Sequence, residues 1–309
     1  MSIRGADRLI LFRESERLAL GSRSLQRGAA NGALHRLRSG AYVPVEVWDA
    51  LLTDDRRRLE TAAMAEMHPA FVASHRSAAA LSRLPSVVID DGLVHARVSV
   101  AAGSRTEHGV RKHAVHDTGL HLTVIDGIVT TSVERTVLDL AATEPFFEAV
   151  VAMDAALRGG VTKERLLIVL DEWAPNRGRR RIERVIAFAD GASGSAGESW
   201  SRVQIAEGGL PAPLLQQRFS DRQGFIGEVD FWWPRFNLIG EFDGMKKYRE
   251  AEILAGRRPG RIVELEKVRE DRLRRSGSRP GVDRWIWSTL RVRGALVAQL
   301  QAAGLPRSH

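Results

Sequence analysis

EVDFWWPRFNLIGEFDGMKKY, residues 228–248, is the stretch of the chain that decides its fold. It contains two hydrophobic segments that we predict to be neighbouring strands, joined by a proline-containing turn at 233–237. Because side chains alternate between the two faces of a strand, Asp230 points to the face opposite its apolar neighbours. Glu241 and Asp243 lie two residues apart and share one face of the second strand. The pattern therefore predicts three carboxylates that converge at one end of a sheet.

Carboxylates gathered in such a place repel one another, and a divalent cation is the usual compensation. Lys246 and Lys247 follow directly and are close enough to add positive charge to the same cluster. Gly244 permits a sharp turn at the end of the second strand. A plainer interpretation stays open, in which the acids form the solvent face of an amphipathic sheet and pair with arginines. Four aromatic side chains favour a packed segment instead: Phe231, Trp232, Trp233 and Phe236.

Length and composition set the outer limits on fold and function. A chain of 309 residues, 44% of them hydrophobic, predicts two or three compact units with filled cores. No apolar run is long enough to span a membrane, and the N-terminus lacks the hydrophobic region expected of a signal peptide. The absence of cysteine excludes disulfides, thiolate zinc sites and cysteine nucleophiles, and it fits a cytoplasmic protein. The net charge of +8 indicates a polyanionic partner, chiefly nucleic acid.

Residues 1–48 are predicted to form a small nucleic-acid-binding domain. We expect short helices at 7–12 and 14–20, a third helix at 22–30, and a two-stranded wing that turns at 39–40. Up to residue 40 the chain holds eight arginines and three acids. This order and charge are typical of a winged helix-turn-helix, although the arginines also fit a merely solvated face. The predicted contacts lie on the third helix and the wing: Arg23, Gln26, Arg27, Arg36 and Arg38.

Residues 49–190 are predicted to form a mixed α/β connector domain. The expected helices cover 54–67, 75–82, 133–142, 146–157, 163–173 and 179–189, and the expected strands cover 94–100, 110–115 and 122–125. The hydroxyls of Thr131 and Ser132 are expected to cap the helix at 133–142. Four histidines lack the spacing of a known zinc site, so we do not expect them to be ligands: His108, His113, His116 and His121. The predicted linkers are 175–178 and 190–194, and the last domain boundary is placed at the second.

Residues 191–309 are predicted to form a compact α/β core. We expect a helix at 195–207, a first strand at 216–219, the two acidic strands, a charged helix at 264–276 and a last strand at 285–290. In this order the second helix crosses over to return the last strand to the sheet. A basic loop at 256–260 would lie near the mouth of the site. Two arginines of this loop and the arginine that follows it are expected to hold a nucleic-acid backbone: Arg257, Arg258 and Arg261.

The order of elements resembles the PD-(D/E)xK restriction-endonuclease-like fold, with Glu198 in the leading helix, Asp230 on the second strand and Glu241 on the third. More narrowly, three segments resemble a group related to very-short-patch-repair endonucleases: GESWSRVQI (197–205), GEFDGMKKY (240–248) and EKVREDRLRRSG (266–277). Two further segments resemble the abortive-infection type IV antitoxin family of winged-helix regulators: GALHRLRSGAYVP (32–44) and TSVERTVLDLA (131–141). The endonuclease resemblance is the more specific of the two.

The endonuclease resemblance implies cleavage of phosphodiester bonds in DNA with Mg²⁺ or Mn²⁺. Asp230 and Glu241 match the metal-binding pair of the family, and Glu198 matches the helical acid that often completes the site. The family places a lysine two residues after the third-strand acid, but this chain has Asp243 there. Asp243 is expected as a further metal ligand. As a carboxylate, it cannot replace the positively charged lysine of the family.

The displaced lysine leaves two functions open. In the first, Lys246, Lys247 or the helical Lys267 takes over the lysine's role in an endonuclease or nicking enzyme that its winged helix directs to DNA. In the second, the chain is a catalytically inactive DNA-binding regulator or antitoxin of a type IV toxin–antitoxin or phage-defence system. DNA is the expected partner in both functions, and no interaction with a membrane is expected. The sequence leaves open whether the chain forms a homodimer and whether it binds a cognate toxin or defence partner.

Overall fold

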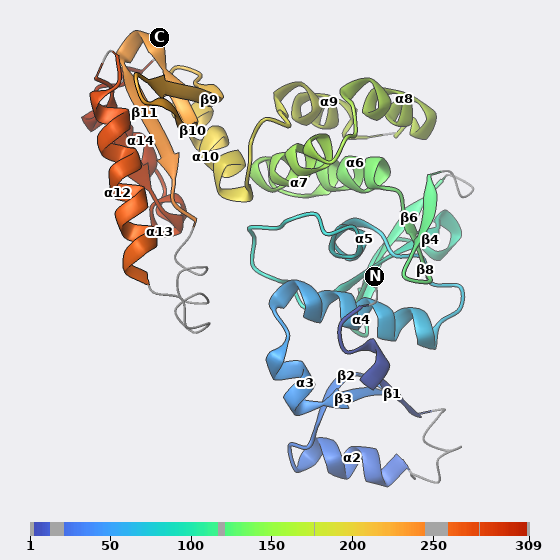
Figure 1. Ribbon diagram of the computed structural model, residues 1–309. Coiled ribbons are helices and arrows are strands. Elements are labelled where there is room, and N and C mark those ends of the chain that lie inside the picture. The colour runs from blue at the N-terminus through green and yellow to red at the C-terminus, as the bar shows by residue number, and fades with distance from the viewer. Residues whose placement is uncertain are drawn as a thin grey trace. The chain divides into compact units, whose positions relative to one another are not determined.

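The structure, a computed structural model shown in Figure 1, describes most of the chain. The described residues are 3–12, 22–116, 121–175, 177–244, 259–277 and 279–307, without the side chains of 22 and 259–266. The chain divides into two compact units, Met1–Pro145 with Val161–Ala187, and Phe146–Gly160 with Phe188–His309. Both units combine helices with small sheets, so the predicted mixed α/β class is confirmed. None of the helices in the described part of the chain is long and apolar enough to cross a membrane.

These two units divide the chain differently from the three predicted domains. The first unit holds residues of both the predicted 1–48 and 49–190 domains. Helix α7 (Phe146–Arg158) belongs to the second unit, although the sequence placed it in 49–190. Its Phe147 stacks on Trp200 of α10 (Ala196–Glu207), with ring centroids 5.2 Å apart.

The N-terminal part of the first unit is a small three-stranded sheet flanked by helices. It comprises η1 (Ala6–Arg8), β1 (Ile10–Leu11), α2 (Ser22–Ala30), β2 (Leu34–Arg38), β3 (Ala41–Pro44) and α3 (Val45–Ala50). The strands lie in the order β1-β3-β2 and pair antiparallel. Gly40, at a φ of 84°, makes the tight turn between β2 and β3. The predicted helix at 22–30 and the two strands predicted around the turn at 39–40 are thus present as α2 and the β2-β3 hairpin.

The prediction of a helix at 7–12 is wrong for its second half. Ile10 and Leu11 form strand β1 and pair with Tyr42 and Ala41 of β3, and Leu11 is buried. Burial beside β3 outweighs the local helical pattern, because tertiary context routinely overrides propensity. The predicted helix at 14–20 lies outside the described residues.

The rest of the first unit alternates helices with short strands. In chain order these are α4 (Thr53–Met67), α5 (His75–Leu81), β4 (Val94–Ser99), η2 (Val100–Ala102), β5 (Arg105–Glu107), β6 (Val110–Val115), β7 (Leu122–Ile125), β8 (Ile128–Thr131), α6 (Val133–Thr143), α8 (Lys163–Trp173) and α9 (Arg179–Phe188). Strands β4 and β6 are parallel, with β5 on the other edge of β6, and β7 and β8 form a hairpin. The Ser132 hydroxyl accepts a hydrogen bond from the Arg135 N–H, which confirms the predicted cap of α6.

The second unit contains a four-stranded sheet between helices. After α7 and α10 come β9 (Leu214–Asp221), β10 (Gly224–Trp233), η3 (Pro234–Phe236), β11 (Leu238–Phe242), α12 (Pro259–Arg275), β12 (Gly281–Trp285), α13 (Trp287–Arg291) and α14 (Ala295–Ala302). The strand order is β12-β11-β10-β9, in which only β11 and β12 are parallel. The predicted order of helix, three strands, helix and strand is therefore present. The last strand ends at Trp285, and the predicted strand at 285–290 is wrong because helix α13 follows directly.

Two apolar clusters fix this sheet between its helices. On one side Phe231, Trp233 and Trp285 pack with residues of α10 and α14. On the other side Leu273 of α12 packs on Val229 and Ile239. These clusters hold β10 and β11 in the centre of the sheet, where both acidic segments lie.

Candidate functional site

Asp230 lies near the end of β10 and is held by the backbone of the neighbouring strand. The pairing of Phe231 with Gly240 puts Asp230 next in register beside Glu241 of β11. The Phe242 N–H donates a hydrogen bond of 2.8 Å to Asp230 Oδ2. The carboxylate is therefore fixed at the point where β10 and β11 separate, as the sequence pattern predicted for this acid.

Glu198 reaches the same place from the first turn of α10. Ser195 caps this helix, and the Gly194 N–H donates a hydrogen bond of 2.7 Å to Glu198 Oε2. The Gln216 amide bridges the two acids, because its Nε2 lies 2.8 Å from Glu198 Oε2 and 3.3 Å from Asp230 Oδ1. The structure thus brings Glu198 and Asp230 together, as the resemblance implied.

Gln216 is a site residue that the sequence reasoning missed. It sits within β9 at a φ of 49°, in the left-handed region that residues other than glycine seldom adopt. The backbone conformation turns the Gln216 amide between the two carboxylates. No periodicity reveals such a bend, and two adjacent glutamines at 216 and 217 were the only available hint.

The electrostatics of Asp230 follow from burial and from like charges. Burial raises the pKa of Asp230 to about 7, and the carboxylates of Glu198 and Glu241 act in the same direction. The hydrogen bonds from Phe242 and Gln216 lower the pKa but do not offset these effects. The carboxylates of Glu198 and Glu241 are thus close enough to Asp230 to disfavour its charged form.

Glu241 is compensated by two arginines in the structure. Its buried carboxylate forms ion pairs with Arg269 of α12 at 2.8 Å and with Arg284 of β12 at 2.7 Å. The parallel pairing of β11 with β12 sets Arg284 directly beside Glu241. The sequence suggested arginine partners only in general terms, because these contacts depend on the strand register and on how α12 crosses the sheet.

Asp243 follows β11, and its backbone N–H donates a hydrogen bond of 2.8 Å to the Trp285 carbonyl. Within the ranges that the structure describes, no three His, Asp or Glu side chains stand as a group able to hold a metal ion. The donor chemistry of Glu198, Asp230 and Gln216 nevertheless fits Mg²⁺, which prefers carboxylate and amide oxygens. Glu241 fits the same role when its carboxylate is not paired with Arg269 and Arg284.

Most of the basic residues predicted around this site lie outside the described residues. These are Lys246, Lys247, Arg257 and Arg258. Arg261 lies in the N-terminal part of α12, where the backbone alone is described.

The predicted nucleic-acid contacts of the first unit fall into two groups. Arg23, Gln26 and Arg27 are exposed on α2, and Arg36 is exposed on β2. Arg38 is half-buried instead, and its Nη2 donates a hydrogen bond of 3.3 Å to the His108 carbonyl. Burial lowers the pKa of Arg38. Four of the five side chains are therefore open to a ligand, while Arg38 also packs within the unit.

A histidine cluster in the first unit was also not foreseen. His113 of β6 stacks on His75 of α5, with ring centroids 3.5 Å apart, and its Nε2 lies 3.0 Å from Nδ1 of His95 on β4. His95 Nε2 lies 3.1 Å from Asp91 Oδ2. Burial is the main reason that the pKa of His113 is lowered to about 3, and the neighbouring His95 lowers it further by charge repulsion. The cluster forms because β4 and β6 are paired, so spacing along the chain could not reveal it.

No family model matches the chain. It is similar to two uncharacterized proteins of Mycobacterium tuberculosis, one from strain CDC 1551 and one from strain H37Rv. Each is 31% identical over 131 residues, which is 41% of this chain and 48% of the relative. The chain therefore spans about half the length of the curated relatives it matches.

Proposed function

We propose that the second unit is a PD-(D/E)xK nuclease-like core that hydrolyses phosphodiester bonds in DNA with Mg²⁺ or Mn²⁺. The observation that carries this proposal is Asp230, whose pKa is raised to about 7 by burial and by Glu198 and Glu241. A carboxyl with a perturbed pKa, beside acids from two other elements, is more typical of a functional site than of a structural ion pair. A divalent cation would remove the mutual repulsion of these groups.

Each residue of the cluster has a distinct part in this proposal. Glu198, Asp230 and Glu241 would supply carboxylate oxygens to the cation, and Gln216 would orient two of them. When bound, the cation polarises a phosphoryl oxygen and lowers the pKa of a bound water. Arg269, released from Glu241, would stabilise the negative charge that develops on the phosphoryl group.

The remaining predicted residues keep their proposed roles at this site. Asp243 is a further carboxylate for the cation, and one of Lys246 and Lys247 positions the attacking water. The nucleic-acid backbone is held by Arg257, Arg258 and Arg261.

The proposal assigns DNA contact to a winged helix in the first unit. The order α2, β2, β3 and the exposure of Arg23, Gln26 and Arg27 support this assignment. A helix that presents its polar face to the major groove, beside a basic hairpin, is the docking mode that these elements fit.

A second function has its own supporting observation. Glu241 is neutralised by Arg269 and Arg284, which is how a site without a metal would be stabilised. On this basis the chain would be a DNA-binding regulator or antitoxin that binds without cutting, as a homodimer or with a cognate toxin.

One experiment separates the two functions. The full chain and its Asp230→Asn variant are incubated with plasmid, single-stranded DNA and RNA in Mg²⁺, Mn²⁺ or EDTA. Asp221→Asn is the matched control, because Asp221 lies on the same sheet and pairs with Arg272, away from the cluster. The nuclease proposal expects metal-dependent cleavage that Asp230→Asn abolishes and Asp221→Asn retains. Tight binding of duplex DNA without cleavage supports the regulator, and cleavage that survives Asp230→Asn contradicts the assigned site.

A further inference from the structure

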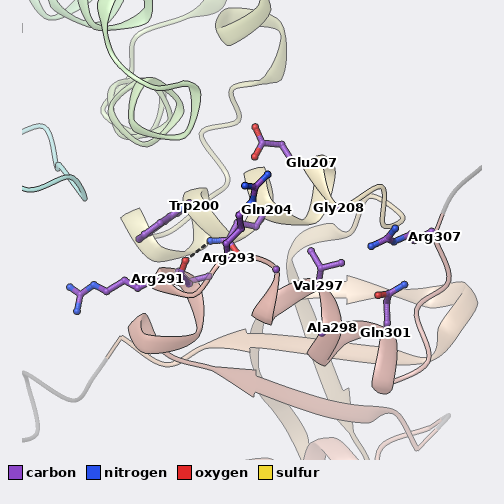
Figure 2. Close-up of a pocket in the computed structure, with 12 residues that line it drawn as sticks. Trp200, Gln204, Glu207, Gly208, Arg291, Arg293, Val297, Ala298, Gln301 and Arg307 are labelled. Atoms are coloured by element: carbon purple, nitrogen blue, oxygen red, sulfur yellow. Dashed lines mark hydrogen bonds between the residues drawn. The ribbon is translucent and has the colours of Figure 1, made fainter.

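The cavities of the two units differ in how their polar side chains are arranged. Figure 2 shows the residues that line a cavity of about 590 Å³ in the second unit. Its arginines, Arg291, Arg293 and Arg307, lie well apart, and Arg291 points away from the cavity, so they do not converge on one point. The cavity of the first unit is smaller, about 310 Å³, but several of its polar side chains come from paired strands and therefore lie close together.

The cavity of the first unit lies on one face of the β4-β6-β5 sheet. Parallel pairing sets His95 of β4 beside Arg111 of β6, and antiparallel pairing sets Thr106 of β5 on the other side of Arg111. Side chains of directly paired residues share a face, and His113, two residues after Arg111, shares it as well. Neighbouring strands are about 4.8 Å apart, so these four side chains lie within the span of one small ligand. The volume, at the lower end of the roughly 300–1,000 Å³ of ligand sites, also favours a small ligand.

The histidines of this cavity form a hydrogen-bonded chain with a defined direction. A carboxylate only accepts hydrogen bonds, so the His95 Nε2–H donates to Asp91 Oδ2 at 3.1 Å. Burial lowers the pKa of His95 and of His113, and both rings are therefore neutral at pH 7. Neutral His95 has no second proton, so its Nδ1 accepts from the His113 Nε2–H at 3.0 Å. His113 Nδ1 is consequently an acceptor, and it receives no hydrogen bond from any residue that the structure describes.

Arg111 is the cation of this cavity that has no carboxylate partner. It is exposed and forms no ion pair within the described part of the chain. After burial and His95, its charge is a further cause of the lowered pKa of His113, so the guanidinium lies near this ring. The other cationic side chains around the cavity pair with Glu144 or Glu107: Arg76, Arg105 and Lys112. The cavity thus offers one uncompensated cation beside an acceptor that lacks a donor.

Two hydroxyl groups add hydrogen-bond donors to the same cavity. Ser104 Oγ accepts from the Ala114 N–H at 2.9 Å, so the proton of this hydroxyl remains available for donation. Thr106 is exposed, and its hydroxyl forms no hydrogen bond with any of the described residues. A ligand for this cavity therefore needs several acceptor oxygens, a negative charge and one proton to donate.

We propose that this cavity binds a phosphate group that carries a proton, in orthophosphate or in a small phosphomonoester. The phosphate oxygens accept from Arg111, whose planar guanidinium matches them, and from the hydroxyls of Ser104 and Thr106. The P–OH group donates to His113 Nδ1. A sulfate or a phosphodiester has no proton at pH 7 and leaves this nitrogen unsatisfied. The site uses no residue of the acid cluster, so it is independent of nuclease activity.

The test uses the full chain in EDTA, so that a metal ion cannot contribute to binding. Orthophosphate, glycerol 3-phosphate and sulfate are each titrated by calorimetry at pH 7.5, in two buffers of different ionisation enthalpy. Arg111→Gln is compared with Arg165→Gln, which removes an exposed arginine of α8 outside the cavity. Thr106→Val is compared with Thr123→Val, which removes an exposed hydroxyl of β7 outside the cavity. The unfolding temperature of each variant shows that it is folded.

We expect phosphate binding to take up a proton, because the second pKa of a phosphomonoester is about 6 and the protonated form is bound. Sulfate should bind at least about ten-fold more weakly, since it leaves a buried acceptor unsatisfied. Arg111→Gln should weaken phosphate binding about ten-fold or more and Thr106→Val about three-fold or more, while both controls stay within about two-fold.

The two phosphates distinguish the source of the ligand. Tighter binding of glycerol 3-phosphate than of orthophosphate identifies a phosphomonoester, and the reverse identifies free phosphate. Equal affinities of Arg111→Gln and Arg165→Gln would overturn the proposal. So would sulfate that binds as tightly as phosphate, or a wild-type protein that binds neither phosphate at millimolar concentrations.

Discussion

The Phe242 N–H of β11 donates a 2.8 Å hydrogen bond to the Asp230 carboxylate of β10. This contact lies just beyond the last paired residues, Phe231 and Gly240, so the carboxylate occupies the place of a ladder partner. It favours the charged form of Asp230, yet burial and Glu198 still hold the pKa at about 7. The fold therefore keeps a carboxylate in an unfavourable position, which is a common property of functional sites.

Asp230→Asn should stabilise the protein at alkaline pH. The pKa of Asp230 is raised from 3.8 to about 7 in the folded state, so between these values the folded chain binds more protons than the unfolded chain. Its contribution to stability consequently falls as the pH rises through this window, by about 1.4 kcal/mol per pKa unit at most. The amide of asparagine can still accept from Phe242 without this penalty. Urea unfolding should show a larger gain in the free energy of unfolding at pH 8 than at pH 4.5.

The matched control for this measurement is Asp221→Asn. Hydrogen bonds from Arg272 lower the pKa of Asp221, so its charged form contributes to stability above its unfolded pKa. We expect Asp221→Asn to destabilise the protein at pH 8, opposite in sign to Asp230→Asn. Equal effects of Asp230→Asn at both pH values would show that its carboxyl is not perturbed.

Arg269→Gln should increase the affinity for Mg²⁺. Arg269 lies 2.8 Å from Glu241, so the arginine and a cation compete for one carboxylate. Removal of a charged partner worth roughly 1.5 kcal/mol corresponds to about ten-fold tighter cation binding. The measurement is the Mg²⁺ concentration that gives half of the thermal shift. Arg272→Gln is the control, since Arg272 pairs with Asp221, and an identical midpoint in both variants would contradict the competition.

Gly197→Ala should destabilise the second unit. A Cβ at Gly197 would collide with the Phe242 ring, so α10 could no longer approach β11 as closely. The strain should cost about 1–3 kcal/mol, which outweighs the gain of about 1 kcal/mol that alanine brings in a helix. Gly277→Ala is the control, because a Cβ there meets no atom within 4 Å. A gain in stability for Gly197→Ala would show that the helix is less closely packed.

His113→Phe should make the protein more resistant to acid. The pKa of His113 is lowered to about 3, so on unfolding below pH 6.5 this ring takes up a proton that the folded chain excludes. Stability from His113 is present above pH 6.5 and is lost as the pH falls toward 3. Phenylalanine keeps the stack on His75 but takes up no proton. The slope of unfolding free energy between pH 6.5 and 4 should decrease, whereas the exposed control His116→Phe should leave it unchanged.

Local sequence patterns predicted the parts of this protein that depend on local chemistry. The alternation around Asp230 identified β10, and the mostly apolar segment before Asp243 identified β11, although the strand ends at Phe242 and leaves Asp243 outside it. The hydroxyl of Ser132 identified the start of α6. These features succeed because a strand face or a helix cap is determined by a few neighbouring residues.

The features that the sequence did not reveal depend on distant contacts. Ile10 and Leu11 are a strand only because β3 lies beside them. Arg284 reaches Glu241 only through the register of β11 with β12. Gln216 lies in the site because its backbone adopts a positive φ, which no sequence pattern predicts. In each case a partner far along the chain determines the outcome.

The central claim is that Glu198, Asp230 and Glu241 together hold a divalent cation. Calorimetric titration of Mn²⁺ into the full chain at pH 7, in two buffers of different ionisation enthalpy, tests it most directly. We expect one binding event that releases a proton, because the pKa of Asp230 is about 7 and the cation binds its charged form. Binding should disappear in Asp230→Asn and persist in Asp221→Asn. The same Mn²⁺ affinity in wild type and Asp230→Asn, or binding without proton release, would contradict the claim.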